Sequence, residues 1–202
     1  MAGHIKPAAV LGFWFGDRTD DAATAKAQAR LWWSKDPAVD AEIRARFAAL
    51  VQAAAFGRHD DWTATPQGRL ALIVLLDQFP RNMHRGSARA FAYDGLARRL
   101  ALEGIAAGAD QQLRPIERVF CYLPLEHSED LAHQDRCVAL YQALAAGVAP
   151  ELRGTFTGYV DFAERHRAII RRFGRFPHRN AALGRVSAAE EVEFLKQPGS
   201  SF

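Results

Sequence analysis

The fold is decided by the stretch TPQGRLALIVLLDQFP, residues 65–80. Thr65-Pro66 is typical of a helix start, because the hydroxyl can cap the first turn and proline at the first helical position lacks only an unused N–H. Residues 70–76 are apolar on every side, which predicts a buried central helix running through Asp77 and broken by Phe79-Pro80. This apolar run of seven residues is far shorter than the ~20 that cross a bilayer.

Similar helix punctuation recurs on both sides of this stretch. Asp36-Pro37 starts a helix with apolar residues at helical spacing that stops near Gly57, and Ser187 with Glu190 matches a capping box. Other helices are expected at 10–15, 22–33, 87–108 (capped by Ser87), 115–123, 128–146 and 159–173. The residues expected to be buried are Ile43, Phe47, Leu50, Leu72, Val74, Leu75, Phe162 and Ile169.

Composition points to one helical domain. The chain has 202 residues, 49% of them hydrophobic and 24% charged, which excludes a disordered chain and predicts a single domain over residues 1–202. There are 38 alanines against 23 Val, Ile and Thr together, and no convincing strand periodicity, so we expect an all-α domain of antiparallel helices. The N-terminus lacks a secretory h-region and the two cysteines form no metal or disulfide framework, which predicts a cytoplasmic protein.

The first unusual polar cluster follows the central helix, in residues 77–86. Asp77 ends the most hydrophobic segment, so we expect it to be partly buried and paired with Arg81, Arg85 or a backbone donor. Such a pair can have a purely structural role, in which it stabilises a turn. The same residues can also form the rim of a ligand pocket.

The second cluster is the polar burst from Glu126 to Asp130. Acids in the first turn of a helix are ordinary partners of the helix dipole, whereas His127 and Glu129 suit a binding site. Glu129 and His133 are spaced i, i+4, but two such residues are too few for a metal site, and we expect none.

The third cluster lies in Arg165–Arg185, which has seven arginines, two histidines and no acid. His166 falls on an apolar helical stripe, where a hydrogen-bonded core histidine is the ordinary interpretation. Gly174 fits a C-terminal cap. The loop after it presents four donors that suit a carboxylate or phosphate, although a merely cationic surface is the alternative. These donors are Arg175, His178, Arg179 and Asn180.

Several strings resemble a known bacterial family, domain of unknown function 924. They span nearly the whole chain: FWFG (13–16), WWSKDP (32–37), LDQFPRN (76–82), HSE (127–129), RFGRFPHRN (172–180) and PGSSF (198–202). The resemblance implies an all-helical fold like that of tetratricopeptide-repeat (TPR) proteins. It implies no activity.

Three functions remain open from the sequence. The first is a pocket for a small anionic molecule, a carboxylate or phosphate, and we expect the three clusters to meet there. The second is a helical scaffold that binds a peptide or protein, which exposed aromatic residues would favour. Nucleic-acid binding through Arg165–Arg185 is disfavoured by the modest net charge of +3. No nucleophile motif, P-loop or Rossmann fingerprint occurs, so whether the protein is an enzyme stays open, and we expect no cofactor and no membrane association.

The chain ends in a large aromatic residue, Phe202. Burial of this ring would be favourable, and the terminal carboxylate could pair with an arginine from Arg171–Arg179. We therefore expect Phe202 to dock against the body, with a frayed terminus as the alternative.

Overall fold

The structure is a computed structural model and describes residues 5–201. No strand occurs in this range, which confirms the all-α prediction. Short 3-10 turns join several of the helices. The α-helices are α1 (Pro7–Phe15), α2 (Asp21–Trp33), α3 (Pro37–Ala55), α4 (Pro66–Ile73), α5 (Phe79–Met83), α6 (Asp94–Ala106), α7 (Pro115–Glu126), α8 (Leu131–Gly147), α9 (Arg153–Phe173) and α10 (Ala189–Leu195).

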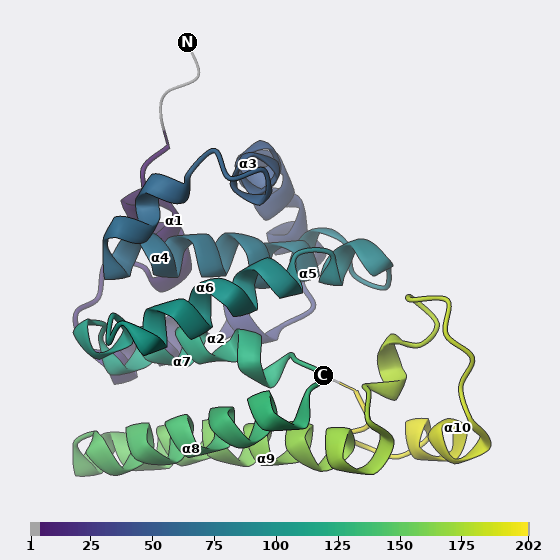
Figure 1. Cartoon of the computed structure of the whole chain (residues 1–202). Helices are drawn as coiled ribbons and strands as arrows, with labels where there is room; N and C mark the ends of the chain where they lie inside the picture. Colours follow the sequence, from purple (N-terminus) through teal and green to yellow (C-terminus); the bar gives the residue numbers. More distant parts are fainter. Residues whose placement is uncertain (1–4, 202) are drawn as a thin grey trace.

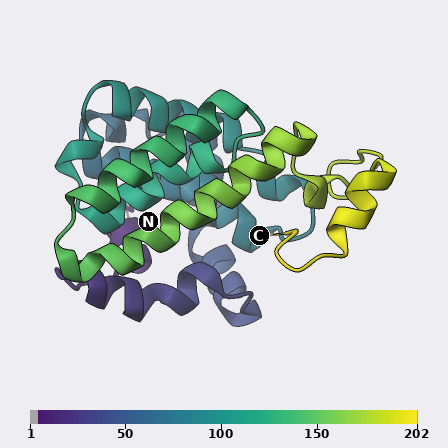
Figure 2. The same cartoon turned by 90° about the horizontal axis from the view of Figure 1, so that it is seen from below.

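The helices pack in layers. The long antiparallel pair α8 and α9 forms one side of the molecule, α6 and α7 lie next to it, and α4 with α5 lies beyond them, towards α1 and α3 (Figure 1). The chain after α9 turns away from this stack, and α10 lies at one end of the molecule (Figure 2). The loop between α7 and α8 therefore lies between the helical stack and the C-terminal segment.

One apolar core runs from α1 to α9 and includes every residue from Leu70 to Leu76. None of those residues is more than 2% exposed, which confirms the buried central helix. Of the side chains expected to be buried, all but Phe162 are buried. Phe162 is half exposed, at 50%, so that prediction was wrong. It lies about 100° around α9 from the buried Ala163, outside the stripe that faces the core.

The central helix does not break at Phe79-Pro80. Val74–Gln78 forms a π-turn, in which the Phe79 N–H bonds to the carbonyl of Val74, and α5 then continues through Pro80. A proline in a regular helix clashes with the carbonyl four residues earlier. The wider π-turn accommodates this proline and leaves Asp77 inside the core.

Two more helix boundaries differ from the prediction around the second cluster. α7 continues through Pro124 to Glu126 instead of ending at 123, and α8 begins after Asp130, whose carboxylate accepts a hydrogen bond from the Ala132 N–H at 2.8 Å. The residues between these helices form a short connection. His127 and Ser128 thus lie at the end of α7, not inside α8.

The caps also differ at two other helices. Ser87 does not cap a helix, because its hydroxyl donates to the carbonyl of His84 and α6 begins only at Asp94. At α10 the capping interaction is displaced by one residue, since the Glu191 carboxylate accepts from the Ala188 N–H at 2.7 Å.

Among the helices that the structure describes, none is both long and apolar enough to cross a membrane. The predicted docking of Phe202 lies outside the described residues.

Candidate functional site

The site begins with Asp77, a carboxylate with no exposed surface. The π-turn directs it towards the end of α7, where Nδ1 of His127 lies 2.8 Å and 3.0 Å from its two oxygens. The side-chain amide of Gln78 donates to the same carboxylate at 2.5 Å. Burial alone raises the pKa of Asp77, but Arg81 and His127 outweigh it and hold the pKa below its usual value. Asp77 is therefore ionised at neutral pH.

Arg81 connects Asp77 to α6. Its Nη1 lies 3.3 Å from Asp77 Oδ1, and its two terminal nitrogens donate to the carboxylate of Asp94 at 2.8 Å and 2.9 Å. Burial lowers the pKa of Arg81, but the two carboxylates raise it overall. The expected Asp77–Arg81 pair is present, whereas Arg85 binds Asp40 instead.

Arg179 approaches from the C-terminal segment. Its guanidinium lies between the rings of Phe91 and Phe176, with its central carbon 4.7 Å and 4.3 Å from the ring centroids. Nη1 donates to the backbone carbonyl of His127 at 2.9 Å and lies 3.6 Å from Asp94 Oδ2. Burial lowers the pKa of Arg179 to about 10, so the side chain remains charged at neutral pH. Its Nε is buried and has no hydrogen-bond partner in residues 5–201.

A pocket of about 310 Å³ lies where these segments meet. It takes residues from α6, from the connection between α7 and α8, and from the segment after α9. Its lining residues are Asp94, Arg98, His127, Ser128, Glu129, Asp130, Arg179 and Leu183.

Glu129 joins the connection to the C-terminal segment. Its carboxylate accepts from both terminal nitrogens of Arg185, at 2.6 Å and 2.9 Å, and from the Phe176 N–H at 2.8 Å. Burial raises the pKa of Glu129, but these hydrogen bonds lower it overall. Glu129 is thus an ionised group whose charge is already compensated.

Behind the pocket, Glu126 contacts His166. The Nδ1 of His166 donates to the carbonyl of Phe162 at 2.8 Å and lies 3.2 Å from Glu126 Oε1. Burial, helped by the nearby charge of Asp77, raises the pKa of Glu126 to about 8, and burial lowers the pKa of His166 to about 3. At neutral pH this is a contact between two neutral groups rather than an ion pair.

The remaining predicted residues lie at the C-terminal end of the site. The His178 ring is 5.6 Å from that of Phe176, and burial lowers its pKa to about 4. Arg175 and Asn180 both bind Glu191 of α10, Arg175 with two hydrogen bonds of 2.7 Å. These two hold the C-terminal segment together instead of lining the pocket.

The three segments therefore do meet, as the sequence predicted. Of the nine predicted site residues, His127, Glu129 and Arg179 line the pocket, and Asp77 and Arg81 lie directly behind it. His166 is buried nearby, and His178 is half-buried. The prediction missed the pocket residues Asp94 and Arg98. On α6 they look like ordinary surface charges, and no local pattern distinguishes them.

The i, i+4 pair Glu129 and His133 does not converge on a common point. Glu129 binds Arg185, while Nδ1 of His133 lies 3.0 Å from the hydroxyl of Ser128. Within residues 5–201 no three side chains of metal-ligating type are grouped so that they could hold an ion.

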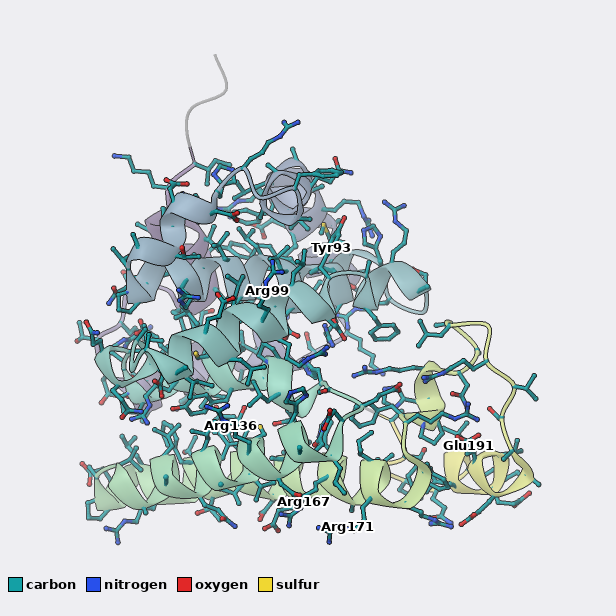
Figure 3. The ribbon with its side chains drawn as sticks, in the orientation of Figure 1. Tyr93, Arg99, Arg136, Arg167, Arg171 and Glu191 are labelled. Atoms are coloured by element: carbon teal, nitrogen blue, oxygen red, sulfur yellow. The ribbon has the colours of Figure 1, made fainter. Side chains whose placement is uncertain are left out.

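Most arginines between 165 and 185 have protein partners. Arg167 and Arg171, at the lower edge of the molecule in Figure 3, lie 3.4 Å and 3.8 Å from Asp135, and Arg172 binds Glu190. Arg175, Arg179 and Arg185 make the contacts described above. The segment is therefore not a row of uncompensated cations.

Comparison with known proteins shows that the chain is similar to bacterial proteins of unknown function. A family model described as "Bacterial protein of unknown function (DUF924)" matches residues 10–199. The structure is similar to that of a protein of unknown function, ATU0120, from Agrobacterium tumefaciens, with 41% sequence identity and a TM-score of 0.80. The similarity covers 94% of this chain and 96% of that one. No curated protein matches the chain.

Proposed function

The chain belongs to the bacterial DUF924 family, whose function is unknown, and we propose from the pocket itself that the protein binds a small anionic molecule, a carboxylate or a phosphate. The ligand lies between α6 and the C-terminal segment, against Arg98 and Arg179. Both line the pocket.

Arg179 is the observation that carries this proposal. A buried guanidinium is costly unless its charge and its N–H groups have partners. Arg179 is only 6% exposed, its nearest carboxylate is 3.6 Å away and its Nε has no partner in the described chain. Nη2 of Arg179 makes no hydrogen bond within residues 5–201 and, unlike Nε, is not fully buried, so an anion in the pocket would supply an acceptor for Nη2. Arginine suits carboxylate and phosphate geometry well.

The other charges of the pocket leave its cations available. Asp94 is bound by Arg81, and Glu129 by Arg185. Arg98, in contrast, forms no ion pair within residues 5–201. Asp130, with its side chain 57% exposed, is the one lining acid without an arginine within ion-pair distance in that range, and it works against an anionic ligand.

Isothermal titration with inorganic phosphate and, separately, with succinate tests the proposal. Arg98→Gln should weaken binding about tenfold or more, because it removes one charge-assisted contact of ~1.5–3 kcal/mol. The matched control is Arg99→Gln, which removes the same charge one residue along α6. Arg99, which is labelled in Figure 3, is outside the pocket lining and lies 3.9 Å from Glu103. Its replacement should leave binding unchanged. Binding of neither anion, or equal affinities of both variants, would contradict the proposal.

Exposed aromatic side chains favour a second candidate, a scaffold for a peptide or protein. Trp33 is 51% exposed and its ring is 6.2 Å from that of Tyr159, while Phe162 is 50% exposed. These residues lie on α2 and α9, outside the lining of the anion-binding pocket. Replacing Trp33 by alanine would reduce partner binding under this candidate and leave phosphate binding intact.

Three further sequence expectations remain proposals. A single domain over residues 1–202 is supported by the apolar core that α1 to α9 share. A TPR-like arrangement is supported by the antiparallel pairing of α8 with α9, and a cytoplasmic location rests on the sequence alone. Nucleic-acid binding is the weakest of the functional candidates, because most arginines of residues 165–185 already have carboxylate partners.

A further inference from the structure

We propose that His127 is the acid–base residue of this pocket, and that Asp77 is the positioning residue that keeps His127 Nε2 able to accept a proton. The proton comes from a hydroxyl group of the bound anionic molecule or from a water molecule beside it. This inference rests on the proposed function for the identity of the ligand, and on the Asp77–His127 pair for the chemistry.

The contact with Asp77 determines which nitrogen of His127 carries the proton. An ionised carboxylate only accepts hydrogen bonds, and both oxygens of Asp77 lie within 3.0 Å of Nδ1. Nδ1 is therefore the protonated nitrogen of the neutral ring. Nε2 keeps its lone pair, which is the state required of a general base.

Nε2 is also accessible from the pocket. Asp77 has no exposed surface, whereas the His127 side chain is 14% exposed and lines the pocket. Nε2 points away from Asp77, and no hydrogen-bond partner for it occurs among residues 5–201. A ligand held by Arg179 lies beside it, because Arg179 donates to the backbone carbonyl of His127 itself.

Other ionisable side chains adjust the basicity of the ring. Burial and the charge of Arg81 lower the pKa of His127, while Asp77 and Asp94 oppose them. On the opposite side the neutral His166 lies with its ring centroid 6.4 Å away. A ring that is neutral before the reaction and faces a carboxylate can take up a proton and release it again.

The proton transfer balances without any other group. The O–H bond of the hydroxyl or water breaks, its oxygen keeps the electron pair, and the proton forms a bond to Nε2. The resulting imidazolium faces the negative charge of Asp77. The same proton then returns from Nε2 to an oxygen of the bound molecule or of the water, whose lone pair forms the new O–H bond, and the ring is neutral again.

The reacting hydroxyl does not come from the protein side chain next to His127. Ser128 is only 3% exposed, and its oxygen lies 3.0 Å from Nδ1 of His133 and accepts from the Asp130 N–H at 3.3 Å. The Ser128 hydroxyl is thus engaged by His133 and by the Asp130 N–H, and not by His127. His127 therefore acts on a group that enters the pocket.

Nitrogen-15 NMR of the histidine-labelled wild-type protein tests the proposal without any substitution. At pH 7, His127 should show a protonated Nδ1 and an unprotonated Nε2. A protonated Nε2 in the neutral ring would overturn the acid–base role.

Carbethoxylation by diethyl pyrocarbonate supplies a second readout, because this reagent attacks unprotonated imidazole nitrogens. The rate at His127 is measured by peptide mass spectrometry relative to His59, which is remote from the pocket. Asp77→Asn should lower the ratio several-fold, since the loss of the carboxylate charge reduces the basicity of Nε2. An unchanged ratio in a variant that retains its circular dichroism spectrum would overturn the role of Asp77. If the Asp77→Asn variant does not fold, the NMR measurement of the His127 tautomer in the wild-type protein decides whether the proposal holds.

Inorganic phosphate separates this inference from the proposed function. Saturating phosphate should slow the modification of His127 and leave that of His59 unchanged. If phosphate does not slow the modification of His127 but Nδ1 carries the proton as expected, the proposed anionic ligand is contradicted and the acid–base role of His127 is retained. If phosphate does slow the modification of His127 but the proton is on Nε2, only the acid–base role is contradicted, and the anionic ligand is retained.

Discussion

At the scale of single residues, the site is a chain of alternating charges. Asp77 contacts Arg81 at 3.3 Å, Arg81 contacts Asp94 at 2.8 Å, and Asp94 lies 3.6 Å from Arg179. Removal of one member of such a buried chain leaves its neighbour as an uncompensated charge, which costs far more than an exposed ion pair contributes. Substitutions at the pocket rim are therefore the cleaner probes of function.

Asp130→Asn should strengthen phosphate binding. Asparagine caps a helix about as well as aspartate, so α8 stays intact while a negative charge leaves the rim of the pocket. An exposed charge pair contributes about 0.2–1 kcal/mol, which corresponds to an affinity gain of up to about fivefold. Titration calorimetry measures it against Asp161→Asn, which removes an exposed acid outside the pocket lining. Equal gains in both variants would show a nonspecific charge effect.

Glu126→Gln should remove a dependence of stability on pH. The pKa of Glu126 is raised to about 8 in the folded protein, above its ordinary value of 4.5. Its contribution to stability is complete below pH 4.5 and is lost as the pH rises towards 8, since the unfolded chain gives up the proton first. Glutamine resembles the protonated acid and does not titrate.

Urea unfolding at pH 5, 6 and 7 measures this difference. The stability of Glu126→Gln relative to wild type should increase with pH by up to about 1.4 kcal/mol per unit. A constant difference between the two proteins would show that Glu126 titrates normally.

At the scale of elements, two local backbone features position the side chains of the site. The π-turn Val74–Gln78 carries the central helix past Pro80, and the left-handed Gly174, with φ 69°, ends α9 and turns the chain towards the pocket. The π-turn positions Asp77, which holds the pocket residue His127, and the turn at Gly174 precedes the segment that carries Arg179 into the pocket lining. The helices between them supply rigid supports.

Two glycine-to-alanine substitutions in α9 should change stability in opposite directions. Gly174→Ala should cost about 1 kcal/mol, because an alanine resists positive φ. Gly158→Ala should gain about 0.5–1 kcal/mol, since alanine is the better residue inside a helix. An added Cβ would have open space at both positions, so only backbone preference differs. Thermal melting measures the direction of each change in melting temperature. Two shifts in the same direction would contradict the assignment of Gly174 as the cap of α9.

At the scale of the whole molecule, the aromatic core and the pocket are built from different residues. The aromatic core centred on α1, α3 and α5 includes Phe47, which is 2% exposed with its ring 5.1 Å from Phe13 and 4.8 Å from Phe79. None of the residues that line the pocket belongs to this core. The core can therefore be weakened without altering the ligand contacts.

Phe47→Ala should lower the free energy of unfolding by roughly 3–5 kcal/mol, through lost burial and the cavity that remains. The far-UV circular dichroism spectrum should stay helical, and the phosphate affinity of the folded fraction should be unchanged. Denaturant unfolding gives the first quantity and calorimetry the second. A loss below 1 kcal/mol would mean that the ring is not enclosed as described.

The sequence by itself determined the helices and the buried face of the core. Asp36-Pro37 and Thr65-Pro66 start helices through hydrogen bonds and backbone angles that involve only neighbouring residues. The apolar run 70–76 has no polar face, so it is buried in the core. The same local rules failed at Pro80, which the π-turn accommodates, and at Pro124, which lies inside α7.

Only the tertiary structure decided which polar residues share the pocket. The clusters around Asp77, His127 and Arg179 were visible in the sequence because each places charge beside apolar helix faces. Arg98 was not visible, and Arg175 and Asn180 turned out to bind Glu191 instead of lining the pocket. The physical reason is that a charge is stabilised by whichever opposite charge the fold brings within about 4 Å. Beyond one helical turn, sequence separation does not say which charges those are.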